Sequence, residues 1–268
     1  MSLSRLTRKA QKFISLLPRK KFRRGLRHGV AAAIEHERTL SGLEINTVVD
    51  IGANIGQFSL LAWTLYPGAR IYAFEPQSGP AAIFQKLFPT SAPITLYRTA
   101  IGTATGQIEM HVSRRHDSSS LLPISKTMTD MGADNDEIGT SFVSIASLTS
   151  FLAPEEIVDP ALLKIDVQGS ELEVLKGSEP LLDRFRYICI ELSFIELYTG
   201  QPLSHEVIRY LDGRGFQLIS IHNLHNDAYG RSAQADFLFG RRALVNGREL
   251  QSDHDGHRAS PKAVALAR

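Results

Sequence analysis

Four acidic side chains stand at the carboxyl ends of four apolar runs. They are Asp50, Glu75, Asp166 and Glu191. The runs are short and apolar, as is typical of parallel strands that are buried on both faces. Because the carboxyl ends of parallel strands meet at one edge of a sheet, the four carboxylates are expected to line one crevice. Carboxylates in such a crevice can hold a cationic ligand, accept hydroxyl groups or remove a proton.

A tight glycine turn follows the first of these runs. It has the sequence Gly52-Ala53-Asn54-Ile55-Gly56, and the helix after it opens with Gln57 and Phe58. The dinucleotide fingerprint needs a glycine where Asn54 stands, and the glycine spacing is one residue short. No Gly-Lys-Ser/Thr follows, which excludes a P-loop. The turn favours a phosphate-free, cationic ligand with an amino-acid end, whose ammonium group Asp50 can engage.

Glu75 is suited to bind a ribose. It lies 19 residues after Gly56, close to the offset of about 20 residues for a ribose-binding acid. Its two oxygens can accept both ribose hydroxyls and would repel a 2′-phosphate. Pro76 then stops the strand. The second run therefore indicates a nucleoside in the same crevice.

Three stretches together resemble the FkbM family of methyltransferases: residues 50–58 (DIGANIGQF), 73–76 (AFEP) and 163–177 (LKIDVQGSELEVLKG). The similarity extends over about residues 45–242. It implies a Rossmann-like class I fold, S-adenosylmethionine as cofactor, and O-methylation of a sugar, a glycolipid or a polyketide-type product. The cofactor-binding residues expected from the motifs and strand ends are Asp50, Gly52, Ala53, Asn54, Gly56, Gln57, Phe58, Glu75, Pro76, Ala100 and Ile101.

The same resemblance places the reactive centre at Asp166. A carboxylate there can take the proton of an acceptor hydroxyl, position the hydroxyl, or help bind a divalent metal. Glu191 is expected to assist Asp166 or to ligate a metal. Lys164, two residues earlier on the same face of the strand, is expected to pair with Asp166 or with the substrate.

Metal dependence stays open at this point. Gln168 stands where the family often has Glu, which weakens the case for a metal or a base at that position. His222 and His225 would complete a ligand set with the two catalytic acids, but their spacing does not specify one. The polar insertion that follows residue 113 is interpreted as a loop. Its candidate residues are Ser119, Ser120 and His116.

The apolar runs predict a seven-stranded, mostly parallel sheet with a terminal antiparallel strand. Strands are expected at residues 47–51, 70–75, 94–101, 161–166, 187–192, 216–221 and 235–239. Ala100 and Ile101 end the third strand, where they would flank an adenine ring. Additional strands are expected at residues 107–112 and from residue 142 onward. Ser204 is expected to cap a helix over residues 205–211.

Length and composition are those of one α/β domain with a basic helical extension. We expect the extension at residues 1–44, the methyltransferase domain at 45–242 and a disordered tail at 243–268. Before Glu35 the extension has ten Lys and Arg residues and no acid, and Pro18 is expected to divide it into two helices. These helices pack on the domain and cover the cofactor pocket, dock on an anionic membrane that holds a glycolipid acceptor, or form a transit peptide.

The single cysteine, Cys189, predicts a reducing compartment. No apolar run approaches the length of about 18 residues that a membrane-spanning helix needs. The protein is therefore expected in the cytoplasm, in solution or peripheral to the membrane. No nucleic-acid partner is expected, because the basic extension lacks interleaved aromatic residues.

Three other functions remain to be weighed. A methyltransferase acting on nitrogen or nucleic acid is permitted by the basic extension, but the absence of an Asn/Asp-Pro-Pro-Tyr/Phe motif after the fourth core strand counts against it. A non-catalytic module that binds S-adenosylmethionine is poorly supported by four intact acids. A nicotinamide-dependent oxidoreductase is disfavoured by the glycine spacing. The acceptor and the oligomeric state are not specified by the sequence.

Overall fold

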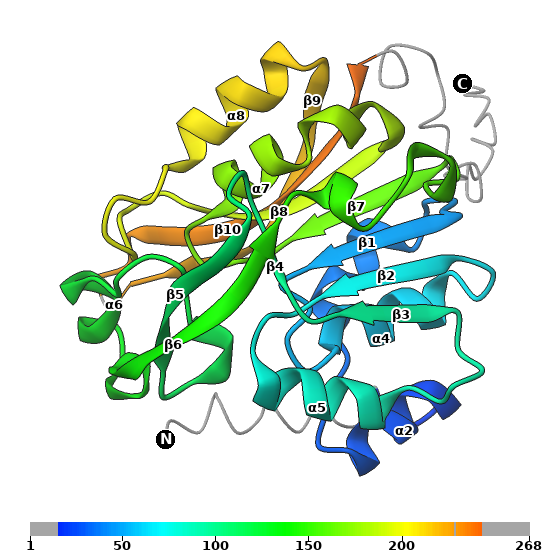
Figure 1. Cartoon of the computed structure of the whole chain (residues 1–268), viewed down its shortest axis with the longest axis horizontal. Coiled ribbons are helices and arrows are strands. Elements are labelled where there is room, and N and C mark those ends of the chain that lie inside the picture. The colour runs from blue at the N-terminus through cyan, green and yellow to red at the C-terminus, as the bar shows by residue number, and fades with distance from the viewer. Residues whose placement is uncertain (1–15, 228, 243–268) are drawn as a thin grey trace, which may run out of the picture.

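A seven-stranded sheet forms the centre of the protein. The computed structural model describes residues 16–227 and 229–242. The strands of the sheet are β1 (Thr47–Ile51), β2 (Arg70–Phe74), β3 (Ile94–Tyr97), β7 (Ala161–Ile165), β8 (Tyr187–Ser193), β9 (Phe216–Asn226) and β10 (Ser232–Arg241). Across the sheet they follow the order β3-β2-β1-β7-β8-β10-β9 (Figure 1). The strand order reverses beside β1, so the switch point of the sheet lies between β1 and β7, where open α/β sheets bind ligands.

The strand directions confirm the predicted mostly parallel sheet. Neighbouring strands from β3 to β8 are parallel, and β10 is antiparallel to both β8 and β9. This antiparallel strand is last in the chain but lies inside the sheet. Phe237 and Phe239 are buried in one hydrophobic cluster and Leu238 in another. Because both faces of β10 are covered, an interior position suits it.

Helices cover both faces of the sheet, which explains the uninterrupted apolar strands. On one face, helices α7 (Glu171–Gly177) and α8 (Ser204–Gly213) pack through Val174 and Val207 against alternate strand residues such as Val49. On the other face, α4 (Gln57–Leu65) packs through Ala62 against Val48. Helix α5 (Ser78–Leu87) follows β2. Val48 and Val49 are neighbours in β1 but pack on opposite faces of the sheet, which is the period-two pattern of a strand.

A second, three-stranded sheet corrects two sequence-based expectations. Residues 94–101 are not one strand, because the chain leaves the central sheet after β3. The segment β4 (Ala100–Ile101) pairs with β6 (Glu137–Ala146), which also pairs with β5 (Gly106–Ser113). The Thr99 hydroxyl donates to the carbonyl oxygen of Ser144 and helps to fix this switch between sheets. The strand expected from residue 142 begins five residues earlier, and the insertion contains a helix, α6 (Lys126–Asp130).

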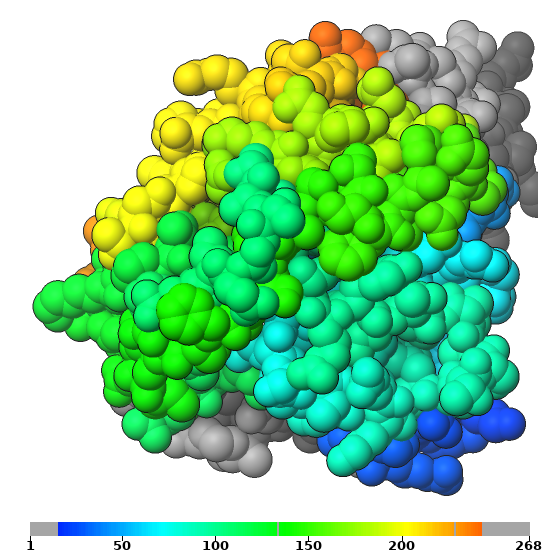
Figure 2. Space-filling view, viewed as in Figure 1, coloured from blue at the N-terminus to red at the C-terminus, as the bar shows by residue number. Residues whose placement is uncertain are grey.

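The second sheet and its insertion form one flank of the molecule. In Figure 1, β5, β6 and α6 lie together to one side of the central sheet. Figure 2 shows this flank in green beside α8 in yellow. An isolated bridge between His111 and Ser120 joins the insertion to β5. The insertion is therefore held as part of the domain.

The described part of the basic extension packs on the domain. Helix α2 (Lys20–Arg27) follows Pro18, as predicted, and buries Phe22 in a cluster with Leu60 and Leu61 of α4. Its exposed residues are Lys20, Arg23 and Arg27. After α2, a 3-10 turn η1 (Ile34–His36) and a short helix α3 (Glu37–Leu40) lead to β1. The first helix expected in the extension and the expected tail at 243–268 lie largely or wholly outside the described residues.

Helix α8 begins one residue earlier than predicted. Ser204 is its first helical residue, and Leu203 takes the N-cap position without a side-chain cap. Instead, the Glu206 carboxylate accepts the backbone N–H of Leu203 at 2.8 Å. A carboxylate in the first turn is also favoured by the helix dipole.

Membrane-spanning segments are absent from the ranges that the structure describes. None of the helices there combines the length and the hydropathy that crossing a bilayer requires.

Candidate active site

A cavity of about 540 Å³ opens at the carboxyl ends of the central strands. The four predicted acids Asp50, Glu75, Asp166 and Glu191 all line it. The other predicted residues that line it are Lys164, Gly52, Ala53, Asn54, Gln57, Phe58, Pro76, Ala100 and Ile101. Gly56 does not line the cavity. The sequence therefore located the crevice, and the structure brings nearly all of the candidate residues to it.

Two positive-φ glycines shape the turn after β1. Gly52 has φ +83°, and a Cβ atom there would lie 1.8 Å from the carbonyl oxygen of Asp166. The turn after β1 is therefore in direct contact with the segment after β7, which only glycine allows. Gly56 has φ +96° at the N-cap of α4, and a Cβ there would contact Phe84 and Phe88. Gly56 thus lets α4 start close to α5, behind the cavity.

We expect Gly52→Ala to lower the free energy of unfolding by about 2–4 kcal/mol, because it combines a backbone clash with a left-handed conformation. Gly68→Ala is the matched control, since a Cβ atom at Gly68 meets nothing within 4 Å. Urea unfolding of both variants measures the difference. Equal stability of the two variants would mean that the contact between the turn and Asp166 is looser than described.

Glu75 is buried and already organises the glycine turn. Its Oε2 accepts the backbone N–H of Asn54 at 2.9 Å, and its Oε1 accepts that of Gln77 at 2.7 Å. Each carboxylate oxygen has two acceptor sites, so acceptor capacity for two hydroxyl groups remains. Burial raises the pKa of Glu75 to about 7. The two backbone hydrogen bonds lower it, but their effect is smaller than that of burial. The fixed, buried carboxylate is the arrangement that a ribose-binding acid needs.

Two hydrogen-bond acceptors near the end of β1, Asp50 and the side chain of Asn54, can bind the amino-acid end of a ligand. Asp50 is buried, and its Oδ2 accepts the Ser59 hydroxyl at 2.6 Å. Burial raises the pKa of Asp50 to about 6. The side-chain carbonyl oxygen of Asn54 is buried without a hydrogen-bond partner in the described structure. A buried acceptor without a donor is costly, and a ligand ammonium group would satisfy it. These observations fit S-adenosylmethionine.

The raised pKa of Glu75 makes stability depend on pH. Between about pH 4.5, its ordinary value, and about pH 7, the folded protein holds a proton on Glu75 that the unfolded chain releases. The free energy of unfolding therefore falls as pH rises through this range, by about 3 kcal/mol for this group. Urea unfolding at pH 5 and pH 8 should show a smaller fall in Glu75→Gln than in the wild type. Identical pH dependence of the two proteins would show that Glu75 ionises normally.

Asp166 and Glu191 are joined by the side-chain amide of Gln168. The Gln168 Nε2 donates to Asp166 Oδ1 at 2.7 Å and to Glu191 Oε2 at 3.0 Å. Gln234 donates to the other oxygen of Glu191 at 2.8 Å. Burial and then the nearby Asp166 carboxylate raise the pKa of Glu191 well above its ordinary value. Asp166 is partly exposed, with 38% of its side chain accessible.

Lys164 is a buried ammonium group between two carboxylates. Its Nζ lies 3.4 Å from Asp236 Oδ1 and 3.6 Å from Asp166 Oδ2. Burial alone would lower the pKa of Lys164, but Asp166 and Asp236 raise it well above its ordinary value. Lys164 therefore stays charged. The predicted pairing with Asp166 is present, and Asp236 is a second partner that the sequence did not indicate.

Several site residues were not recognised from the sequence. Tyr198 donates to Gln168 Oε1 at 2.8 Å and so fixes which end of the amide faces the two acids. Gln168 itself has a left-handed backbone conformation, with φ +59°, which no local sequence pattern predicts. Gln234 and Asp236 come from β10, far along the chain. Contacts of this kind depend on strand order and have no short-range sequence signal.

Of the candidate serine and histidine residues, some line the cavity and others do not. His116, Ser119 and His225 line the cavity, whereas Ser120 is buried and its hydroxyl donates to the carbonyl oxygen of Gln168. His222 faces His36 instead, with His36 Nδ1 3.3 Å from His222 Nε2. The ligand set of two histidines with Asp166 and Glu191 is not formed within the described residues.

The sheet order, the glycine turn and the acid-lined crevice at the switch point define a Rossmann-like, class I methyltransferase. The chain belongs to the FkbM methyltransferase family. The model of the methyltransferase FkbM domain matches residues 50–218, which is more than half of the chain. S-adenosylmethionine is accordingly the cofactor.

Three relatives are similar over most or about half of their length. The 2-O-methyltransferase NoeI of Sinorhizobium fredii is 27% identical, over 70% of this chain and 81% of the relative. The 31-O-demethyl-FK506 methyltransferase FkbM of Streptomyces tacrolimicus is 28% identical, over 65% of this chain and 74% of the relative. The hexuronic acid methyltransferase AglP of Haloferax volcanii is 28% identical, over 56% of each chain. The protein is an S-adenosylmethionine-dependent methyltransferase.

Proposed function

We propose that the protein methylates a hydroxyl group of a sugar, a glycolipid or a polyketide-type product, with Asp166 as the general base. When bound, S-adenosylmethionine supplies an electrophilic methyl group. The observation that carries the proposal is the Asp166 carboxylate at the end of β7, which lines the cavity with 38% of its side chain accessible, whereas the strand-end acids Asp50 and Glu75 are buried. A hydroxyl group has a high pKa and must lose its proton as the new bond forms, which requires a base at the open part of the site.

Different residues of the cavity bind different parts of S-adenosylmethionine. Glu75 accepts the ribose hydroxyls, while Asp50 and the Asn54 side-chain carbonyl accept the ammonium group. The Gly52 turn allows close approach of the backbone, and Ala100 and Ile101 flank the adenine. Their burial and their place in the cavity lining support these roles.

At the acceptor end, three residues hold Asp166 ready to accept a proton. The Lys164 ammonium group lies 3.6 Å from one oxygen of Asp166, and the Gln168 amide donates to the other oxygen. Glu191 is held by two amides and has a raised pKa, so it keeps its proton more readily than an exposed acid. The proton of the acceptor therefore goes to Asp166, and Glu191 assists by sharing the Gln168 amide.

The donor groups around this acid pair argue against a divalent metal there. Both oxygens of Glu191 accept amide hydrogens, and the two oxygens of Asp166 face the Gln168 amide and the Lys164 ammonium group. The Lys164 ammonium group, 3.6 Å from Asp166 Oδ2, would repel a divalent cation placed beside that oxygen. The proposed reaction therefore uses no metal bound to Asp166 and Glu191.

The printed names of two relatives support oxygen as the methylated atom, since they specify 2-O and 31-O methylation. A third relative is named for a hexuronic acid, which supports a sugar. The exposed basic residues of α2 (Lys20, Arg23 and Arg27) suit contact with an anionic membrane surface. Such contact would place the protein on a surface that holds glycolipid acceptors, so we include peripheral membrane binding in the proposal.

The test is to incubate the full chain with methyl-labelled S-adenosylmethionine and three acceptor panels: hydroxylated sugars and glycolipids, amines, and RNA. Label appearing in a methyl ether, with Asp166→Asn inactive, is expected. Label transferred only to amines or RNA would overturn the proposal. Sedimentation with anionic vesicles, compared with a Lys20→Glu/Arg23→Glu/Arg27→Glu variant, tests the membrane contact separately.

A further inference from the structure

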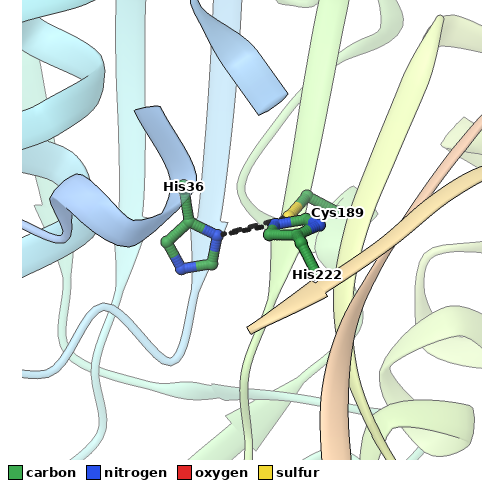
Figure 3. Close-up of side chains that lie close together, drawn as sticks. All are labelled: His36, Cys189 and His222. Atoms are coloured by element: carbon green, nitrogen blue, oxygen red, sulfur yellow. Dashed lines mark hydrogen bonds between the residues drawn. The ribbon is translucent and has the colours of Figure 1, made fainter. Parts of the chain in front are cut away.

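A cluster of two histidines and one cysteine lies on the face of the sheet that α4 covers, beside the catalytic cavity. His36 comes from η1, Cys189 from β8 and His222 from β9 (Figure 3). One nitrogen of each histidine and the cysteine sulfur all lie within 4.8 Å of one another. It is the single group of this kind in the ranges that the structure describes. We propose that His36, Cys189 and His222 bind one Zn²⁺ ion.

The separations of the donor atoms fit tetrahedral zinc. Zn–N bonds of about 2.0–2.1 Å and a Zn–S bond of about 2.3 Å place two nitrogens about 3.4 Å apart and a nitrogen and a sulfur about 3.6 Å apart. His36 Nδ1 lies 3.3 Å from His222 Nε2, and Cys189 Sγ lies 4.0 Å from His36 Nδ1. The third separation, between Cys189 and His222, is at most 4.8 Å, so the thiol must move toward the two histidines to complete the geometry. Figure 3 shows the His36 ring facing the His222 ring, with the Cys189 sulfur behind it.

A carboxylate behind His36 also suits a bound metal ion. On the far side of the His36 ring, Nε2 lies 3.7 Å from Asp236 Oδ2. A carboxylate behind a ligating histidine orients the ring and makes it a better ligand. The Cys189 thiol would release its proton to solvent as the Zn–S bond forms. The thiolate would then offset one positive charge of the ion, and the Asp236 carboxylate, which also faces the Lys164 ammonium group, would offset part of the second.

The backbone of β9 is irregular where it supplies His222. The pairing of β9 with β10 shifts between Gln234 and Asp236, where two residues of β9 oppose one of β10, and Asn223 has φ +52°. Such a bulge re-aims the side chains around it. Asn223 also donates to Asp236 at 2.9 Å and fixes the carboxylate behind His36.

Zinc at this position would tie the extension to the catalytic domain. His36 precedes β1 in sequence by one short helix, and it lines the catalytic cavity. Three protein ligands from η1, β8 and β9 would hold one wall of that cavity in place. The inference is independent of the proposed acceptor, because it concerns metal affinity and does not involve turnover.

The test uses the full chain, stripped of metal with a chelator and titrated with Zn²⁺ alone or with Co²⁺ as a spectroscopic probe. We expect one Zn²⁺ per chain and, with Co²⁺, a thiolate-to-cobalt charge-transfer band. Cys189→Ala should abolish the band, and His222→Gln should weaken Zn²⁺ binding by at least about 100-fold. His225→Gln, on the same strand but outside the cluster, should bind Zn²⁺ as the wild type does.

Folding of each variant is checked by thermal melting, and His222, which is only half-buried, provides a mild second variant beside the buried Cys189. The inference is overturned if the folded wild type binds no Zn²⁺, if Co²⁺ gives no thiolate band, or if Cys189→Ala and His222→Gln bind Zn²⁺ as tightly as His225→Gln.

Discussion

Asp166→Asn should lower kcat for methyl transfer by about 10²–10⁴-fold, the usual contribution of a general base. The amide cannot accept the acceptor's proton, although it nearly preserves the shape of the carboxylate. The dissociation constant for S-adenosylmethionine should change by less than about threefold, because Asp50 and Glu75 bind that ligand at other strand ends. Steady-state kinetics at saturating cofactor, together with calorimetric titration, separate the two effects.

The control for this variant is Asp212→Asn. Asp212 lies on α8 and has 69% of its side chain accessible. It should keep wild-type kcat and wild-type cofactor affinity. Turnover within a few-fold of the wild type in Asp166→Asn would remove Asp166 from the proposed mechanism.

Glu75→Ala should raise the dissociation constant for S-adenosylmethionine by about 100-fold or more. A hydrogen bond to a charged group contributes about 1.5–3 kcal/mol, and Glu75 is expected to accept two from the ribose. The variant also leaves the backbone N–H groups of Asn54 and Gln77 without their acceptor, so the glycine turn loses its support. Calorimetric titration measures the affinity.

Glu44→Ala is the comparison for Glu75→Ala, since Glu44 is exposed and precedes β1. Its affinity for the cofactor should equal that of the wild type. A folded Glu75→Ala protein with unchanged affinity would show that the ribose lies elsewhere.

The crevice could be predicted because its signals are local. Buried parallel strands appear in the sequence as short apolar runs, and each predicted acid directly follows or closes such a run. Gly52 likewise marks a turn whose positive φ few other residues tolerate. These features depend on neighbours in the sequence, so they can be recognised without the fold.

The rest of the site depends on contacts between distant segments. Gln168 was considered only as a departure from the family pattern, yet it joins Asp166 to Glu191 because Tyr198, 30 residues later, fixes its other end. His36 faces His222 across 186 residues of sequence. Such contacts follow from strand order and from a bulge in β9, and neither has a periodic signal in the sequence.

The second sheet was also hard to predict, for a similar reason. Ala100 and Ile101 were assigned to the cavity correctly but to the wrong sheet. Their apolar character fits the end of β3 as well as it fits pairing with β6. Only the position of β6 decides between the two, and β6 comes about 40 residues later in the chain.

The most direct test of the account is calorimetric titration of the folded wild-type protein with S-adenosylmethionine and, separately, with NADH. The buried acids, the unpaired Asn54 carbonyl oxygen and the short glycine turn predict that the sulfonium compound binds at one site and that NADH does not. Binding of NADH, or no binding of S-adenosylmethionine by folded protein, would contradict the assignment of the cavity.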